Sequence, residues 1–108
     1  MIPSERVEAL IADLKDLLDH AALLTKRGRE AFDSDVALPL AFEAMCNRVG
    51  DIAKKLMLED PQRFSDAAWK DAAKNRDFVV HQYHRIDPDI LWLTAVKSFP
   101  HLRELLSD

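Results

Sequence analysis

The residues of this chain best suited to chemistry lie close together in its second half. Arg76 is followed after four residues by His81 and, one residue later, by Tyr83. Arginine offers a rigid fork of donors that fits a phosphate, and histidine moves protons near neutral pH. Together they supply a phosphate clamp and a general base, which a metal-free cleavage of a phosphodiester needs. An ordinary half-buried helix could also contain the same residues without a catalytic role.

The spacing of this motif raises a geometric question. Each residue of an ideal α-helix advances by about 100°, so Arg76 and His81 lie about 140° apart, whereas Arg76 and Tyr83 share a face. The arginine and the histidine would therefore not meet on one straight helix. Either the helix bends between them, or each residue faces a site that another chain completes.

Length and composition indicate a helical protein. A chain of 108 residues predicts a single domain, residues 1–108, that can bury a core without disulfide or metal. Hydrophobic residues make up 48% and charged residues 31%, and there are only two glycines, which favours an all-α fold. We expect an antiparallel bundle of four to five helices. Cys46 is the only cysteine, which excludes an internal disulfide and fits a reducing compartment.

The location expected from the sequence is the cytoplasm. The longest apolar run is far too short for a membrane span, and the start of the chain does not have the pattern of a signal peptide. We therefore expect no membrane association.

The charge distribution limits any contact with nucleic acid. The net charge is −4, and residues 1–60 hold eight Lys or Arg against twelve Asp or Glu, whereas residues 61–108 hold seven of each. The acidic excess thus lies in the first half, away from the motif. Any binding to nucleic acid should be local, weak and sensitive to salt. The candidate contacts are Arg63, Lys70, Lys74, Arg76 and Arg85.

Hydrophobic periodicity and turn residues predict the helices. The first should begin with Ser4 as N-cap and end near Lys26–Gly28, before a polar connection over residues 29–35. The second should be capped by Ser34 or Asp35, with Pro39 in its first turn, and should stop before Asp60–Pro61. The third should start around Ser65–Asp66 and carry the motif. Asp87–Pro88–Asp89 reads as another helix start, and Pro100 should open a last short helix.

Gly50 lies inside the second predicted helix. Glycine there costs about 1 kcal/mol relative to alanine, so its presence needs a reason. The close approach of a neighbouring helix is the simplest one.

The sequence gives less support to a metal site, a phosphate-binding loop or a serine nucleophile. Asp77, His81 and His84 could be drawn together as a metal site, but the chain has no second ligand cluster. It also has no cysteine pair for zinc, no glycine-rich phosphate loop and no serine-centred elbow. We therefore expect no metal and no cofactor.

The residues from Trp69 to Tyr83, with Arg85-Ile86-Asp87 and Ile90-Leu91-Trp92 after them, resemble the HepT-like branch of the HEPN superfamily. That family carries an Arg, four residues, a His, one residue and a Tyr, after a Trp. Residues 44–56, with Gly50 at their centre, resemble the family's second helix, so the resemblance covers nearly the whole chain. Two positions depart from the pattern: Asp77 stands where Asn is frequent, and Asp51 stands where Glu is usual.

The resemblance implies a toxin ribonuclease of a two-gene toxin–antitoxin module, with a minimal nucleotidyltransferase as antitoxin. It implies a homodimer whose Arg–His pairs face an interface cleft, with Arg76 and His81 catalytic and Asp77 and Asp51 supporting them. By the same analogy Tyr83 is the residue that the partner adenylylates. The expected cleavage products are a 2′,3′-cyclic phosphate and a 5′-OH. The alternative is a non-catalytic helical partner that binds substrate for a nucleotidyltransferase.

Overall fold

The computed structural model describes residues 2–81 and 87–107, except for the side chains of residue 3 and residues 77–81. Every regular element in this part of the chain is helical, which confirms the all-α prediction. The elements are α1 (Pro3–Thr25), α2 (Gly28–Ser34), α3 (Ala37–Glu59), α4 (Ala67–His81), α5 (Pro88–Leu93), a π-helical turn η1 (Thr94–Ser98) and α6 (Phe99–Leu105).

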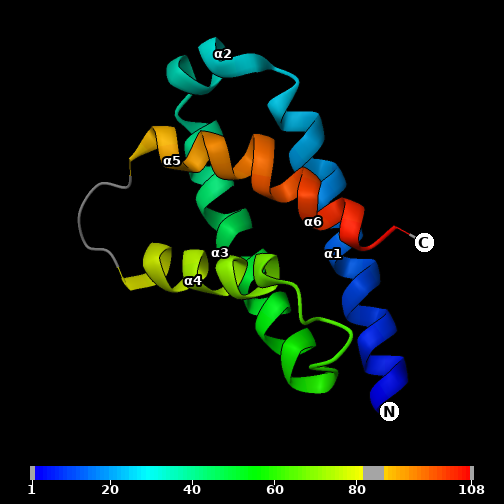
Figure 1. The fold of residues 1–108 in the computed structure, drawn as a ribbon. Coiled ribbons are helices and arrows are strands. Elements are labelled where there is room, and N and C mark those ends of the chain that lie inside the picture. Colours follow the sequence, from blue (N-terminus) through cyan, green and yellow to red (C-terminus); the bar gives the residue numbers. More distant parts are fainter. Residues whose placement is uncertain (1, 82–86, 108) are drawn as a thin grey trace.

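The helices pack around α3. Helices α1 and α3 run in opposite directions, and α4 lies across the second half of α3 (Figure 1). The segments α5, η1 and α6 follow one another without a break and form one C-terminal rod, which packs against α1 and α3. Helix α4, which carries the Arg76 motif, is therefore positioned mainly by α3.

One hydrophobic core joins residues from all of these helices. The rings of Phe32 and Phe42 stack with centroids 5.2 Å apart, and Trp92 lies 5.4 Å from Phe32. Burial of such large side chains drives the helices together, because removing each one from water contributes about 1.5–3 kcal/mol. The most deeply buried large side chains are Leu14, Phe32, Phe42, Val49, Leu56 and Leu102.

At three of the predicted helix starts an aspartate carboxylate binds a backbone N–H group. Asp66 and Asp87 directly precede α4 and α5, whereas Asp35 lies one residue before Val36, the N-cap of α3. The carboxylates of Asp35, Asp66 and Asp87 accept hydrogen bonds from backbone N–H groups two residues later, at 3.0, 2.9 and 2.8 Å. These bonds satisfy donors that the first helical turn leaves open. The position of Pro39 in the first turn of α3 and the end of that helix at Glu59 also agree with the sequence prediction.

Two predicted caps are wrong. Helix α1 begins one residue before Ser4, with Ile2 at the cap position and no side-chain cap. Pro3 suits the first helical position because its fixed φ is helical and it has no N–H to satisfy. The Ser34 hydroxyl donates instead to the Glu30 carbonyl at 2.9 Å, inside the preceding helix.

The predicted polar connection over residues 29–35 is also wrong, because most of it forms α2. Gly28 has φ +88°, a conformation that glycine adopts easily, and it turns the chain between α1 and α2. Phe32 is 1% exposed, so the short helix is held by a core contact. Arg29 contacts Asp33 at 2.8 Å and Asp89 at 2.6 Å, which ties α2 to the start of α5. The hydrogen bonds to Asp33 and Asp89 raise the pKa of Arg29.

The last short helix starts where expected but is not separate. Pro100 lies in the first turn of α6, and the Phe99 N–H bonds to the Thr94 carbonyl five residues back. A proline inside an α-helix lacks a donor and clashes with the carbonyl four residues earlier. The wider π turn before Pro100 accommodates the proline without ending the rod.

Candidate functional site

Helix α4 carries the motif and is fixed at its start. Trp69 is 2% exposed and meets Phe64 edge-on, with ring centroids 5.2 Å apart. Ala73, one turn later, is also buried. These contacts set the rotation of α4 about its own axis, and so they decide which face Arg76 presents to α3.

The side-chain stem of Arg76 packs directly on Gly50 of α3. A Cβ atom built on residue 50 would lie 2.0 Å from Arg76 Cβ and 2.7 Å from the Ala72 carbonyl oxygen. Only a residue without a side chain allows this approach, which confirms the reason inferred for a glycine inside the helix. The contact holds the half-buried Arg76 at a fixed place on the surface of α3.

The backbone of α4 is α-helical without interruption from Ala67 to His81. Arg76 and His81 therefore occupy one helix, five positions apart, where ideal geometry separates them by about 140°. No break in this described stretch brings the two positions to one face. The side chains of Asp77 and His81, and the whole of Tyr83, His84 and Arg85, lie outside the described residues.

Three of the candidates that can be placed lie on the two helices that form this contact, namely Asp51 on α3 and Lys70 and Lys74 on α4. Arg63 does not: it lies before α4, and its guanidinium is 3.1 Å from the carboxylate of Glu8 on α1. Asp51 follows Gly50, is half-buried, and has its carboxylate 3.1 Å from the Lys55 ammonium one turn later. Lys70 and Lys74 are exposed on α4, one turn apart. Residue Asn47, which precedes Gly50 by nearly one turn, has a buried amide oxygen without a hydrogen-bond partner in the described part of the chain. Sequence reasoning missed Asn47, because nothing in its local pattern marks it.

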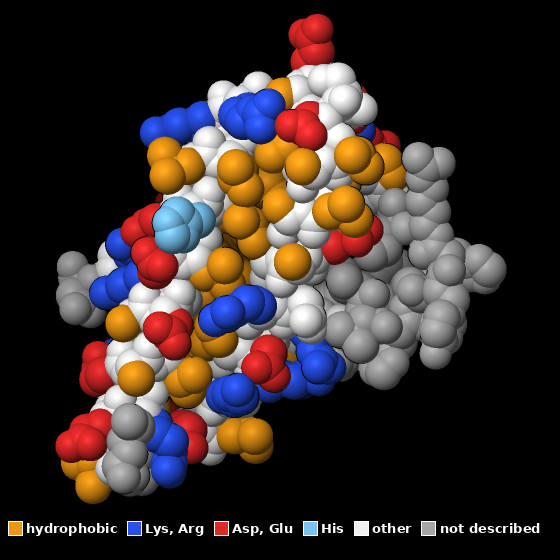
Figure 2. Space-filling view, turned by 180° about the vertical axis from the view of Figure 1, so that it is seen from behind, with side chains coloured by type: hydrophobic (Ala, Val, Ile, Leu, Met, Phe, Trp, Pro, Cys, Tyr) orange, Lys and Arg blue, Asp and Glu red, His pale blue; other side chains and the backbone are white. Residues whose placement is uncertain are grey.

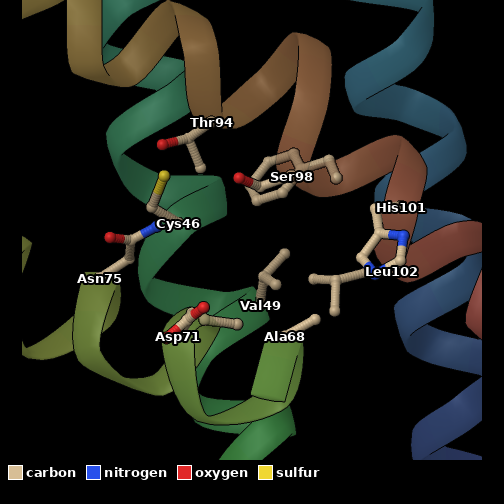
Figure 3. A pocket seen from close by; sticks show the side chains of 11 residues that line it. Cys46, Val49, Ala68, Asp71, Asn75, Thr94, Ser98, His101 and Leu102 are labelled. Carbon is tan, nitrogen blue, oxygen red and sulfur yellow. The ribbon is translucent and has the colours of Figure 1, made fainter. Parts of the chain in front are cut away.

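Sequence reasoning also missed a cavity of about 130 Å³ between α3, α4 and the C-terminal rod. Figure 3 shows Asp71 and Asn75 of α4 on one side of it and Ser98 on the other, with Cys46 of α3 between them. Burial, and then the nearby charge of Glu43, raises the pKa of the Cys46 thiol to about 12. The thiolate is the nucleophilic form, so Cys46 forms a wall of the cavity and not its reactive group.

Charges of both signs alternate on the surface. In Figure 2 a strip of hydrophobic side chains runs down the middle of the visible face, with basic and acidic groups interspersed around it. On the described part of this face, basic side chains do not form one extended surface of the kind that binds a long nucleic acid.

The described residues contain neither a metal cluster nor a membrane span. No group of three His, Cys, Asp or Glu side chains is placed to hold a metal there. The side chains of Asp77, His81 and His84 lie outside that part of the chain, so the expectation that they hold no metal stays a prediction. None of the described helices is both long and apolar enough to cross a bilayer.

Comparison with known proteins identifies the family. The family model described as Ribonuclease HepT-like matches residues 11–108, which include the Gly50–Arg76 contact and all of α4. This chain belongs to the HepT-like ribonuclease family. The resemblance inferred from the motif is thereby confirmed.

Individual relatives span most of the chain. A protein of Caldanaerobacter subterraneus subsp. tengcongensis, named as a candidate RNase, is 28% identical over 99 residues, covering 88% of each chain. Another named candidate RNase, from Methanocaldococcus jannaschii, is 24% identical and covers 95% of this chain and 86% of its own. A protein of Thermococcus cleftensis named as a probable ribonuclease HepT is 23% identical, covering 83% of this chain and 86% of its own. No solved structure gives a significant match.

Proposed function

We propose that this HepT-like chain is a metal-independent endoribonuclease in which Arg76 holds the scissile phosphate and His81 is the general base. The observation that carries the proposal is the packing of Arg76 on Gly50. A catalytic cation must be held in place before the reaction, because preorganised charge is what stabilises a transition state. Membership in a ribonuclease family supplies the substrate class, RNA.

The proposed reaction uses the ribose itself. His81 removes the proton of a 2′-OH, and the oxygen attacks the adjacent phosphorus. The bond from phosphorus to the 5′ oxygen breaks, and that oxygen takes up a proton. The products are a 2′,3′-cyclic phosphate and a 5′-OH. Arg76 offsets the negative charge that builds on the phosphoryl oxygens, with Asp77 and Asp51 in supporting positions.

The site is proposed to form at the interface of a homodimer. Positions 76 and 81 diverge by about 140° on one uninterrupted helix, so a second copy is the simplest way to complete an Arg–His pair. A two-fold dimer is the commonest homo-oligomer and would place two such pairs in one cleft.

The reaction can be tested with a single-stranded RNA and a DNA of the same sequence. We expect the RNA to be cut in the presence of a chelator, with a 2′,3′-cyclic phosphate at the new end, and the DNA to stay intact because it has no 2′-OH. Mass spectrometry of the fragments identifies the chemical groups at both new ends of the cleaved RNA. Loss of cleavage on adding EDTA, or cleavage of the DNA, would contradict the mechanism. If the purified protein bound a nucleotidyltransferase but cut no RNA, the non-catalytic alternative would hold.

The biological role that we propose is that of a toxin controlled by a nucleotidyltransferase antitoxin. Tyr83 lies two residues after His81, so a nucleotide attached to its hydroxyl would be close enough to obstruct the site. The attached phosphodiester would also add a negative charge beside Arg76, which disfavours binding of a polyanion.

Co-expression with the cognate nucleotidyltransferase tests this switch. We expect the intact mass of the chain to rise by whole adenylyl units and RNA cleavage to fall, and we expect both effects to disappear in Tyr83→Phe. The phenylalanine variant is a close control, because it differs only by the hydroxyl group. An unchanged mass together with full inhibition would show that the partner blocks the site by occupying it.

A further inference from the structure

The cavity between α3, α4 and the C-terminal rod has the size of a small ring. Its volume is about 130 Å³, and an apolar cavity of about 150 Å³ engineered in another protein holds benzene. Its walls are mostly apolar, with Val49, Phe99 and Leu102 among them. A flat ring could therefore be buried against these side chains.

The rim of this cavity carries polar side chains that can still form hydrogen bonds with a ligand. Asp71, Asn75, Ser98 and His101 all line it. None of the four makes a side-chain hydrogen bond or ion pair in the described part of the chain. A mostly apolar pocket with a few convergent polar groups is the usual form of a small-molecule site.

The charge of the rim indicates which chemical groups a bound ring should carry. Among the described side chains that line the cavity, Asp71 provides a carboxylate, and neither a lysine nor an arginine accompanies it. A carboxylate only accepts hydrogen bonds, so it favours a ring that carries an amino group and repels a phosphate. Asn75 adds both a donor and an acceptor beside it, which suits a ring with mixed edges.

We propose that this cavity binds one nucleobase of the RNA, an amino-bearing base with cytosine as the best fit. Cytosine is a single ring whose edge presents an N4 amino group, whereas uracil has a carbonyl oxygen at the same place. Unstacked bases of single-stranded RNA are commonly read in this way, through their edges and faces. The inference rests on the proposed ribonuclease function and names a specificity subsite for it.

The cavity lies close to Arg76, the residue proposed to hold the scissile phosphate. Asn75 directly precedes Arg76, and Ala72 both lines the cavity and touches the Gly50 contact. The cavity thus lies beside Arg76 on the same helix. An RNA strand that crosses α4 could place a phosphate at Arg76 and the base of the same or a neighbouring nucleotide in the cavity.

Cytidine and uridine are the matched probes, since they differ only at this edge of the ring. We expect cytidine, titrated into the full-length protein and followed by ¹H–¹⁵N NMR, to shift resonances of Asn75 and Ser98. It should bind on the order of fivefold or more tightly than uridine, the least that one good base contact gives. Asp71→Asn should remove the preference, and Ala68→Leu, which fills the rim with a larger side chain, should abolish binding. Asp13→Asn is the control, because it removes an exposed carboxylate of α1 that does not line the cavity. This variant should bind cytidine like wild type.

The outcomes separate this inference from the ribonuclease proposal. Equal binding of cytidine and uridine, or none by either, would overturn the base pocket even if RNA is cut. The base pocket would also be overturned if the shifts mapped elsewhere, or if a protein partner and not a nucleoside filled the cavity. Cytidine binding without RNA cleavage would contradict the endoribonuclease and leave the pocket intact. With both activities present, wild type should cut beside cytosine in preference to uracil, and Asp71→Asn should not.

Discussion

Replacing His81 with alanine is expected to slow RNA cleavage by about 10²–10⁴-fold, the usual cost of removing a general base. Arg76→Ala should cost about 10²–10³-fold, because the developing charge on the phosphate loses its fixed counter-charge. The measurement is the initial rate of cleavage of a labelled single-stranded RNA under chelator, with unfolding monitored separately. His20→Ala, which removes an exposed histidine of α1 and not one of α4, should keep the rate of the chemical step.

The two inactive variants also test whether the site is shared. If Arg76 of one copy works with His81 of the other, a mixed dimer of the two variants keeps one intact site and one doubly impaired site. Random pairing makes half of the dimers mixed, so about a quarter of wild-type activity should return after the variants are unfolded together and refolded. Each variant carried through the same treatment alone should stay inactive.

A different result would place the site elsewhere. Full activity of His81→Ala would exclude it as the base. A stable monomer in light scattering at micromolar concentration, with wild-type activity, would show that one copy is sufficient. Inactive mixtures of variants that do form dimers would mean that each Arg–His pair comes from a single chain.

Replacing Gly50 with alanine is expected to destabilise the protein by about 1–2 kcal/mol in total, against the usual preference of helices for alanine. Helix propensity alone would make the substitution stabilising by about 1 kcal/mol. The new Cβ, however, would lie 2.0 Å from Arg76 Cβ and 2.7 Å from a backbone oxygen of α4. Neither atom can move away by rotating a side chain, so α3 and α4 must separate. Overpacking typically costs about 1–3 kcal/mol, and a contact this short belongs to the upper half of that range, which exceeds the gain in helix propensity. Urea unfolding measures the change.

The same substitution should reduce RNA cleavage by the protein that remains folded. Moving α4 away from α3 displaces Arg76, and a shift of about 1 Å in a positioned group can cost roughly 10²-fold in rate. Gly28→Ala is the matched control. Nothing lies within 4 Å of a Cβ at residue 28, but its φ of +88° disfavours a side chain, so it should lose about 1 kcal/mol. Its rate of cleavage should not change.

Equal stability of Gly50→Ala and wild type would contradict the prediction, because separating α3 and α4 would then cost only the roughly 1 kcal/mol that the helix preference for alanine returns. Stability greater by that amount would mean that the two helices do not touch at this point. A destabilised Gly50→Ala that cuts RNA at the wild-type rate would show that the contact serves folding and not the placement of Arg76.

Local sequence determined the helix starts and the composition of the motif. At the starts of α3, α4 and α5, the carboxylates of Asp35, Asp66 and Asp87 bind N–H groups only two residues away, so no distant part of the chain is needed to predict these bonds. The wrong prediction of a polar connection over residues 29–35 has a non-local cause. Helix α2 is too short to be stable alone, and it depends on the burial of Phe32 and on an ion pair with Asp89, sixty residues later in the chain.

The candidate site was also predictable from the sequence only in part. The sequence alone predicted which residues could carry the chemistry, and it placed a glycine inside a helix where a close approach would explain it. Only the tertiary structure decided that Arg76 is the residue that approaches Gly50, and only it brought Asp71 and Asn75 to the same cavity as Ser98 and His101. Periodicity gives the face of each helix, but the pairing of faces depends on how side chains of several helices fill one core.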